Sequence, residues 1–231
     1  MKQPMSKAKS LTYVIIALAI CVFLLGIGFV WILKVFGLDE ITAGFMASQI
    51  GILAFALVLF EFKYKELFKT FNFKITLKSI AIVGICVSLV IAINIAVGTI
   101  MNILDLNDVK VQEYTENTTK AMIENGNIMT LFILPIIAAP IFEEFAFRAG
   151  FKRILVDESN WKPSHFVIIS SILFGLLHWQ PGTFSFIPII VTGAIGVVLA
   201  IVYLKTENLL LSIFIHMLYN LIIMSVAFVT T

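Results

Sequence analysis

Charged residues are scarce in this sequence, and their scarcity argues against a water-soluble fold. Only 13% of the 231 residues are charged, whereas 60% are hydrophobic. A typical soluble domain has about 25% charged and about 45–50% apolar residues. A soluble core of this size cannot bury the surplus of apolar side chains, so we predict a protein of the lipid bilayer. The formal net charge of only +2 gives no reason to expect a nucleic-acid partner.

Cysteine is rare as well, and nothing in the sequence indicates a separate soluble unit. Cys21 and Cys86 lie in different apolar runs, without a CxxC spacing or a Cys/His cluster, so we interpret both as small apolar helix residues. The first apolar run has no small-residue cleavage site at its end, which indicates a retained anchor. We predict a single membrane domain over residues 1–231, with a three-helix part at 1–126 and a catalytic helix core at 127–231.

Seven apolar segments reach or approach the length of about 20 residues that a membrane-spanning helix needs. The fifth segment is short, and the fourth carries charged residues near its end. The segments are Leu11–Phe36, Ile41–Phe60, Ser79–Leu104, Asn127–Phe151, Pro163–Trp179, Phe184–Leu204 and Asn208–Thr230. They predict an all-α polytopic membrane protein with about seven transmembrane helices.

The loops between these segments alternate in charge, and this alternation predicts their sides of the membrane. Lysines are concentrated before Leu11 and in the loop Glu61–Lys78, whereas the stretch Asp105–Glu124 is mainly acidic. Further cations follow the fourth and sixth segments. The positive-inside rule therefore predicts a multi-pass protein of the cell (plasma) membrane with a cytoplasmic N-terminus and, after seven spans, an external C-terminus.

The last four predicted helices contain polar residues that hydrocarbon does not tolerate easily. A charged residue near the centre of a spanning helix costs roughly 2.5–3.5 kcal/mol on insertion scales. Such groups have to face one another or a wet cavity, and they are functional candidates by default. The residues are Glu143, Glu144, Arg148, His178, His216 and Asn220. They predict a polar site within the last four helices.

Spacing supports the convergence of these side chains. Glu144 and Arg148 are four residues apart and can pair on one helical face, and His216 and Asn220 have the same spacing. Glu143 is rotated by about 100° from Glu144 on a helix, so the two carboxylates are expected to differ in role. One is expected to face the cavity while the other holds a neighbouring helix.

Three motifs stand in order on separate predicted helices: EExxxR from Glu143 to Arg148, FxxxH from Phe174 to His178, and HxxxN from His216 to Asn220. Together they resemble the CAAX protease and bacteriocin-processing family, also called the Abi family, which includes the type II CAAX prenyl protease. The resemblance covers roughly Leu131–Leu221 and leaves the first three predicted helices uncovered.

The resemblance implies an intramembrane endopeptidase with defined residue roles. Glu143 and His178 would activate the attacking water, and His216 and Asn220 would stabilise the oxyanion. Glu144 and Arg148 would order the site. The family includes regulators and immunity proteins too, so a non-proteolytic protein that binds a membrane partner, such as a sensor kinase or a transporter, is the alternative function.

The chemistry of the residues leaves two other mechanisms open. Glu143, His178 and His216 also form a ligand set suited to catalytic zinc, although no HExxH is present. We favour the metal-free, glutamate-dependent mechanism, with no cofactor, and keep zinc as the alternative. Ser212 lies one turn before His216, but no carboxylate is near in sequence to complete a serine triad.

The expected substrate is a membrane-associated peptide or protein, such as a prenyl-like, bacteriocin or signalling peptide precursor. The bilayer is the second partner, and a membrane signalling protein would take the place of the substrate under the alternative function. A proton or ion carrier is the least favoured hypothesis, because it predicts carboxylates on paired discontinuous helices. This sequence has one carboxylate cluster on one helix.

Overall fold

The computed structural model describes residues 5–61, 76–104, 117, 120, 123–124, 129–179 and 186–230. Every regular element within these ranges is a helix, so the predicted all-α class is confirmed. The lysine-rich loop, the acidic stretch and the connection after the fifth predicted segment lie mostly outside the described residues.

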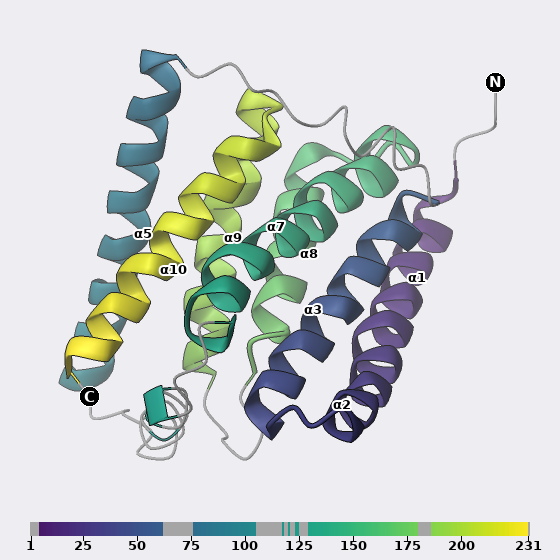
Figure 1. The fold of residues 1–231 in the computed structure, drawn as a ribbon. Coiled ribbons are helices and arrows are strands. Elements are labelled where there is room, and N and C mark those ends of the chain that lie inside the picture. The colour runs from purple at the N-terminus through teal and green to yellow at the C-terminus, as the bar shows by residue number, and fades with distance from the viewer. Residues whose placement is uncertain are drawn as a thin grey trace.

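The first half of the chain contributes three helical passes to the described structure (Figure 1). The elements are α1 (Lys7–Leu18), the π-helical η1 (Ala19–Leu25) and α2 (Gly26–Val35), which form one path, then α3 (Glu40–Leu59) and α5 (Leu77–Ile103). The Asp39 carboxylate starts α3 by accepting a hydrogen bond from the Thr42 N–H at 2.9 Å. Thr76 and Ser79 start α5 with a capping box.

The second half contributes four passes to the described structure. The elements are η2 (Met129–Ala138), α7 (Ala139–Glu144), η3 (Phe145–Gly150) and η4 (Lys152–Asp157), then α8 (Pro163–Leu176), α9 (Ile187–Thr206) and α10 (Leu209–Thr230). The segments η2, η3 and η4 are π-helical, and with α7 they follow one helical path. Glu207 adopts a left-handed φ of 48°, which ends α9 and reverses the chain into α10.

Helices occupy each of the seven predicted segments, but only some are long α-helices. Four described helices are long and apolar enough to cross a membrane: Thr42–Leu59, Leu77–Ile103, Ile187–Thr206 and Leu209–Val229. The first and fourth predicted segments contain π-helical stretches, and α8 is shorter. A multi-pass membrane fold follows from the four candidates, whereas the count of seven spans stays a prediction.

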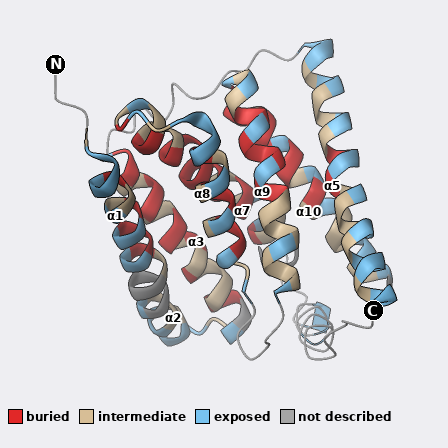
Figure 2. Ribbon diagram, turned by 180° about the vertical axis from the view of Figure 1, so that it is seen from behind, coloured by how far each residue is buried: buried red, intermediate tan, exposed pale blue. Residues whose placement is uncertain are grey.

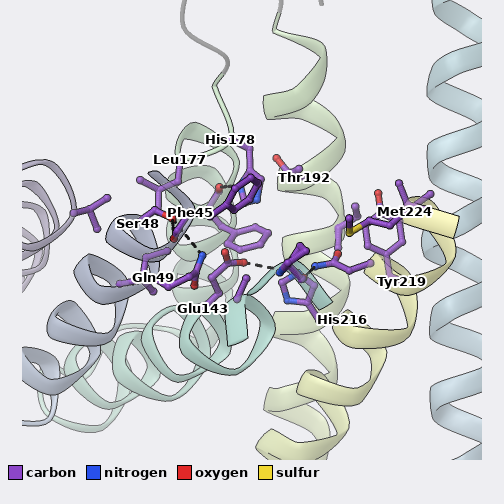
Figure 3. A pocket seen from close by; sticks show the side chains of 18 residues that line it. Phe45, Ser48, Gln49, Glu143, Leu177, His178, Thr192, His216, Tyr219 and Met224 are labelled. Carbon is purple, nitrogen blue, oxygen red and sulfur yellow. Dashed lines mark hydrogen bonds and ion pairs between the residues drawn. The ribbon is translucent and has the colours of Figure 1, made fainter. Parts of the chain in front are cut away.

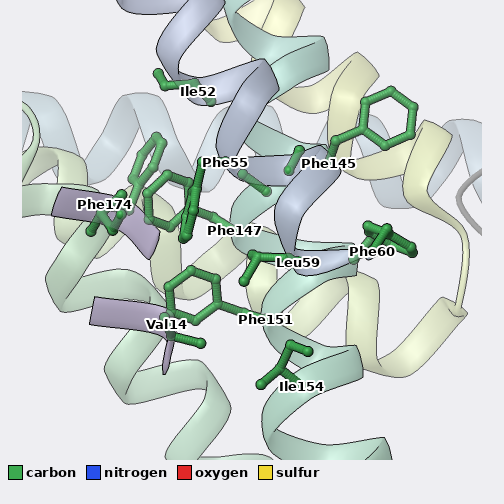
Figure 4. Packing of buried hydrophobic residues seen from close by; sticks show 14 of the residues in the cluster. Val14, Ile52, Phe55, Leu59, Phe60, Phe145, Phe147, Phe151, Ile154 and Phe174 are labelled. Atoms are coloured by element: carbon green, nitrogen blue, oxygen red, sulfur yellow. The ribbon is translucent and has the colours of Figure 1, made fainter. Parts of the chain in front are cut away.

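An aromatic core joins the first half of the chain to the helix that carries the glutamates (Figure 4). Phe55 of α3 meets Phe147 of η3 edge-on at 6.1 Å between ring centroids. Phe147 in turn meets Phe174 of α8 at 5.5 Å. A second cluster, which includes Val90, joins α5 to α9 and α10.

Helices α8 and α9 pack backbone against backbone through small residues. A Cβ added at Gly175 would lie 2.5 Å from the Ile189 carbonyl oxygen, and a Cβ at Gly196 would lie 3.2 Å from the Ser171 Cα. Small residues permit such close approach between helices in lipid. This packing fixes how deep the end of α8, with its FxxxH motif, sits against α9.

Cationic helix ends gather at one end of the bundle, where α1, α5 and α8 begin and where η4 and α9 end (Figure 1). There the Trp161 indole N–H donates to the Ser10 hydroxyl at 3.1 Å, which joins the start of α1 to the start of α8. Lys34, at the other end, pairs with Glu40 at 3.4 Å. The arrangement agrees with the predicted topology, whose sidedness stays a prediction.

Burial separates the bundle interior from the faces available to lipid. Buried residues lie along α3, α7, α8, α9 and α10, while α5 at the edge is mostly exposed (Figure 2). Only 11% of the apolar window of α5 is buried. Its exposed side chains, Ile85 and Ile95 among them, are those expected to contact lipid.

Candidate active site

Four of the predicted site residues line one cavity of about 430 Å³ between the helices (Figure 3). Glu143 stands at the end of α7, and His216 and Asn220 stand one turn apart on α10. His178 lies in the turn after α8, because that helix ends at Leu176 rather than at the predicted Trp179. Chain segments far apart in sequence therefore present a carboxylate, two imidazoles and an amide to one space.

Glu144 is the centre of a buried polar cluster beside this cavity. Its Oε2 accepts a short hydrogen bond from the Ser212 hydroxyl and lies 3.1 Å from the Arg148 Nε. Its Oε1 lies 3.2 Å from the His216 Nδ1. Glu144, Arg148 and Ser212 have no exposed surface. Three partners on two helices thus hold the Glu144 carboxylate in one orientation.

The Arg148 guanidinium is enclosed by packing as well as by charge. Its Cζ lies 4.8 Å from the centre of the Phe174 ring, which is within the range of a cation–π contact. Phe174 also contacts both motif histidines, with ring centroids 4.8 Å from His178 and 5.8 Å from His216. The phenylalanine of FxxxH therefore positions three polar side chains at once.

Glu143 faces the cavity, as the 100° rotation from Glu144 permits. Its Oε2 lies 3.8 Å from the His216 Nε2, which is too long for a hydrogen bond and leaves room for adjustment. His216 is therefore set between two carboxylates, with Nδ1 toward Glu144 and Nε2 toward Glu143. The Glu143 side chain is 9% exposed and lines the cavity.

His178 and Asn220 are each anchored by a main-chain carbonyl. The His178 Nδ1 lies 2.9 Å from the Phe174 carbonyl oxygen. A carbonyl only accepts, so Nδ1 carries the proton there and Nε2 keeps its lone pair in the neutral ring. The Asn220 amide donates one N–H to the Pro135 carbonyl at 2.8 Å and keeps its second N–H.

Several cavity residues are not among the site residues predicted from the sequence. Ser48 and Gln49 of α3 line the cavity, and so does Tyr219, whose hydroxyl accepts a 2.6 Å hydrogen bond from Asn94 of α5. A glutamine inside the apolar run Ile41–Phe60 was the available signal, because an unpaired polar group in hydrocarbon is costly. It stood alone, without a motif partner.

The metal-free mechanism and the zinc alternative both stay predictions. Within the described ranges, no three His, Cys, Asp or Glu side chains are grouped so that they could hold one metal ion. The proposed ligands Glu143, His178 and His216 line the same cavity without forming such a group.

One family model matches the part of the chain that holds the site. Residues 125–222 match the type II CAAX prenyl endopeptidase Rce1-like family, which confirms the resemblance drawn from the three motifs. Neither a curated protein nor a solved structure matches the chain. Helices α1, α2, α3 and α5 lie outside the matched residues.

Proposed function

We propose that this chain is an intramembrane endopeptidase that hydrolyses peptide bonds of membrane-associated substrates with a water molecule activated by Glu143. One observation carries the proposal: Glu143, His178, His216 and Asn220 line a single cavity within the segment that matches a prenyl endopeptidase family. An apolar bundle retains so costly a set of groups only where they have a use.

Glu143 and His178 are assigned to the water. Glu143 takes a proton from water as its oxygen attacks the carbonyl carbon, with the His178 Nε2 accepting a hydrogen bond from the same water. The tetrahedral adduct then collapses, the C–N bond breaks, and the proton on Glu143 passes to the leaving amine. One water is consumed for each new carboxyl and amino group, so the step balances without a cofactor.

His216 and Asn220 are assigned to the oxyanion. The second Asn220 N–H is a suitable donor, and the His216 Nε2 becomes one when the ring carries both protons. Donors that are already oriented stabilise developing charge strongly in a site of low dielectric constant. Glu144 supports that protonated ring through Nδ1, and Arg148 and Ser212 hold Glu144 in place.

Cleavage by the purified protein tests the proposal. The first probe is a farnesylated CAAX-type peptide carrying a fluorophore and a quencher, because the name of the matched family points to a prenylated chain end. Glu143→Gln is expected to lower kcat at least about 100-fold, since a general base contributes typically 10²–10⁴. Glu207→Gln, an exposed carboxamide substitution outside the cavity, is the matched control and is expected to retain full activity.

Further measurements separate the metal-free mechanism from the metal-dependent one, and the enzyme from the binding function. Activity that persists after dialysis against a strong chelator supports the metal-free mechanism, whereas loss that zinc restores would establish the metal-dependent one. Normal cleavage by Glu143→Gln would remove Glu143 as the base. If alanine at Glu143, His178 and His216 leaves the cellular phenotype of the gene unchanged, the non-proteolytic binding function replaces the enzyme.

A further inference from the structure

Gln49 brings a polar group to the cavity from the half of the chain that no motif covers. It lies on α3, outside the matched residues 125–222, and lines the cavity together with Glu143 (Figure 3). Gln49 is only 6% exposed. Its Nε2 reaches the Ser48 hydroxyl at 3.4 Å, a long contact, and its Oε1 has no hydrogen-bond partner among the described residues.

An unpartnered amide oxygen is an unfavourable group to bury. Leaving a buried acceptor unsatisfied lowers stability, and a methionine or leucine of similar size carries no such penalty. Ser48 cannot be the missing donor for the Gln49 Oε1, because the Ser48 hydroxyl already donates its proton to the Phe45 carbonyl of its own helix at 2.8 Å. The Oε1 atom is itself buried in the free protein, so a partner that enters the cavity meets this acceptor when the Gln49 side chain turns toward it.

The position of Gln49 is set by two close contacts of α3. A Cβ added at Gly51 would lie 2.7 Å from the Cys21 carbonyl oxygen, so α3 touches η1 backbone to backbone. At the C-terminal end of α3, the Leu59 side chain would lie 2.6 Å from a Cβ added at Gly150 of η3. These contacts on two sides fix the rotation of α3, and with it the side of the helix on which Gln49 faces the cavity.

The other polar groups of the cavity already have partners or roles in the reaction. His178 is tied to Phe174, Asn220 to Pro135, and His216 lies between the two carboxylates. An extended peptide entering this apolar space brings main-chain N–H and C=O groups that also need partners. Gln49 supplies an acceptor for one of these peptide N–H groups.

We propose that Gln49 is a substrate-binding residue whose Oε1 accepts a hydrogen bond from a main-chain N–H of the peptide beside the scissile bond. The proposal rests on the endopeptidase function and adds to it a main-chain recognition site on α3. A main-chain contact is independent of side-chain identity, so Gln49 serves extended peptide segments in general and fixes their register against Glu143.

Gln49→Met tests the proposal because methionine keeps the volume and removes the acceptor. With the fluorogenic peptide, KM is expected to rise about fivefold, the value of one neutral hydrogen bond, with a smaller change in kcat. The melting temperature of the purified protein is expected to stay level or rise, because a buried unpartnered oxygen is removed. Ser159→Ala removes another buried unpartnered oxygen, away from the cavity, and is expected to leave KM unchanged.

A second measurement identifies the contacted N–H. Peptides in which one flanking main-chain N–H is replaced by an ester oxygen are compared on wild-type protein and on Gln49→Met. At the contacted position, the ester is expected to raise KM about fivefold for wild type and to have no further effect on Gln49→Met. At other positions, the two proteins are expected to respond equally.

The outcomes separate this proposal from the one on which it rests. If wild type cleaves the peptide but Gln49→Met has an unchanged KM, or every ester acts equally on both proteins, Gln49 has no role in binding and the endopeptidase stands. If Gln49→Met raises KM only together with a fall in melting temperature, the residue is structural. If wild type does not cleave, both proposals fail together.

Discussion

At the scale of single residues, the two adjacent glutamates have different surroundings, and Ser212 is part of the reason. Glu143 ends in the cavity, whereas Glu144 is surrounded by Arg148, His216 and Ser212. The structure also accounts for Ser212 without a nucleophilic role, because its hydroxyl donates to a carboxylate instead of to a histidine.

Ser212→Ala is expected to lower stability more than it lowers chemistry. A buried hydrogen bond to a charged group is worth about 1.5–3 kcal/mol, so the melting temperature should fall. Arg148 and His216 still hold Glu144, so kcat should fall less than about tenfold. Ser225→Ala, on the same helix but exposed and bonded to its own backbone, is the control and should match wild type. A folded Ser212→Ala protein without any activity would instead support a serine nucleophile.

At the scale of elements, α3 is the link between the uncovered half of the chain and the site. It packs on η1 at Gly51 and on η3 through Phe55 and Leu59, and it carries Gln49 on its cavity side. A shift of α3 would therefore move a cavity wall without touching any motif residue. The motif helices alone do not enclose the cavity.

Gly51→Ala is expected to push α3 away from η1. The added Cβ would lie 2.7 Å from a backbone oxygen that cannot rotate away, and overpacking of this kind costs typically 1–3 kcal/mol. We expect a lower melting temperature and a higher KM in the peptide assay. Gly44→Ala on the same helix meets nothing within 4 Å and should be neutral or slightly stabilising. Equal melting temperatures for the two variants would contradict the close contact.

At the scale of the whole molecule, the start of α1 and the end of α10 lie at opposite ends of the bundle (Figure 1). The helical passes of the described residues alternate in direction, and the opposite positions of these two helix ends fit an odd number of membrane crossings. Cationic helix ends at the N-terminal side fit a cytoplasmic N-terminus under the positive-inside rule. The plasma membrane as location and the sidedness remain predictions.

Labelling of single cysteines tests this topology. In a background with Cys21 and Cys86 replaced, Lys9→Cys should react with a membrane-impermeant maleimide only in inside-out vesicles, and Val229→Cys only in right-side-out vesicles. Both positions are exposed in the structure, so access to reagent depends on the side of the membrane. Reaction of both cysteines from the same side would require an even number of crossings and would reject the seven-span topology.

Much of the candidate site could be predicted from the sequence because its residues are polar and stand in apolar segments. Glu143, His178 and His216 stand in apolar runs, and each belongs to a motif that contains a pair of residues four positions apart. Gln49 is also a polar residue in an apolar segment, but no sequence spacing relates this single amide to the three motifs. Ser212 was noticed beside His216, and its bond to a carboxylate 68 positions away was not readable from the sequence.

Helix positions were predictable for a local reason, and helix lengths were less so. Hydropathy over about 20 residues depends only on the segment itself, so the membrane class and the all-α fold follow from composition and runs. The π-helical stretches around α7 and the early end of α8 at Leu176 have no such local signal. The helices concerned pack against α3 and α9, and the local sequence does not specify these contacts.

By itself, the sequence determined that this is a helical membrane protein and which polar groups cannot face lipid. Each of these features is set by the chemistry of contiguous residues. Only the tertiary structure decided that Ser212 and His216 hold Glu144, and that α3 brings the Gln49 amide to the cavity. These features depend on contacts between side chains from distant segments, and only the close packing of the folded protein defines those contacts.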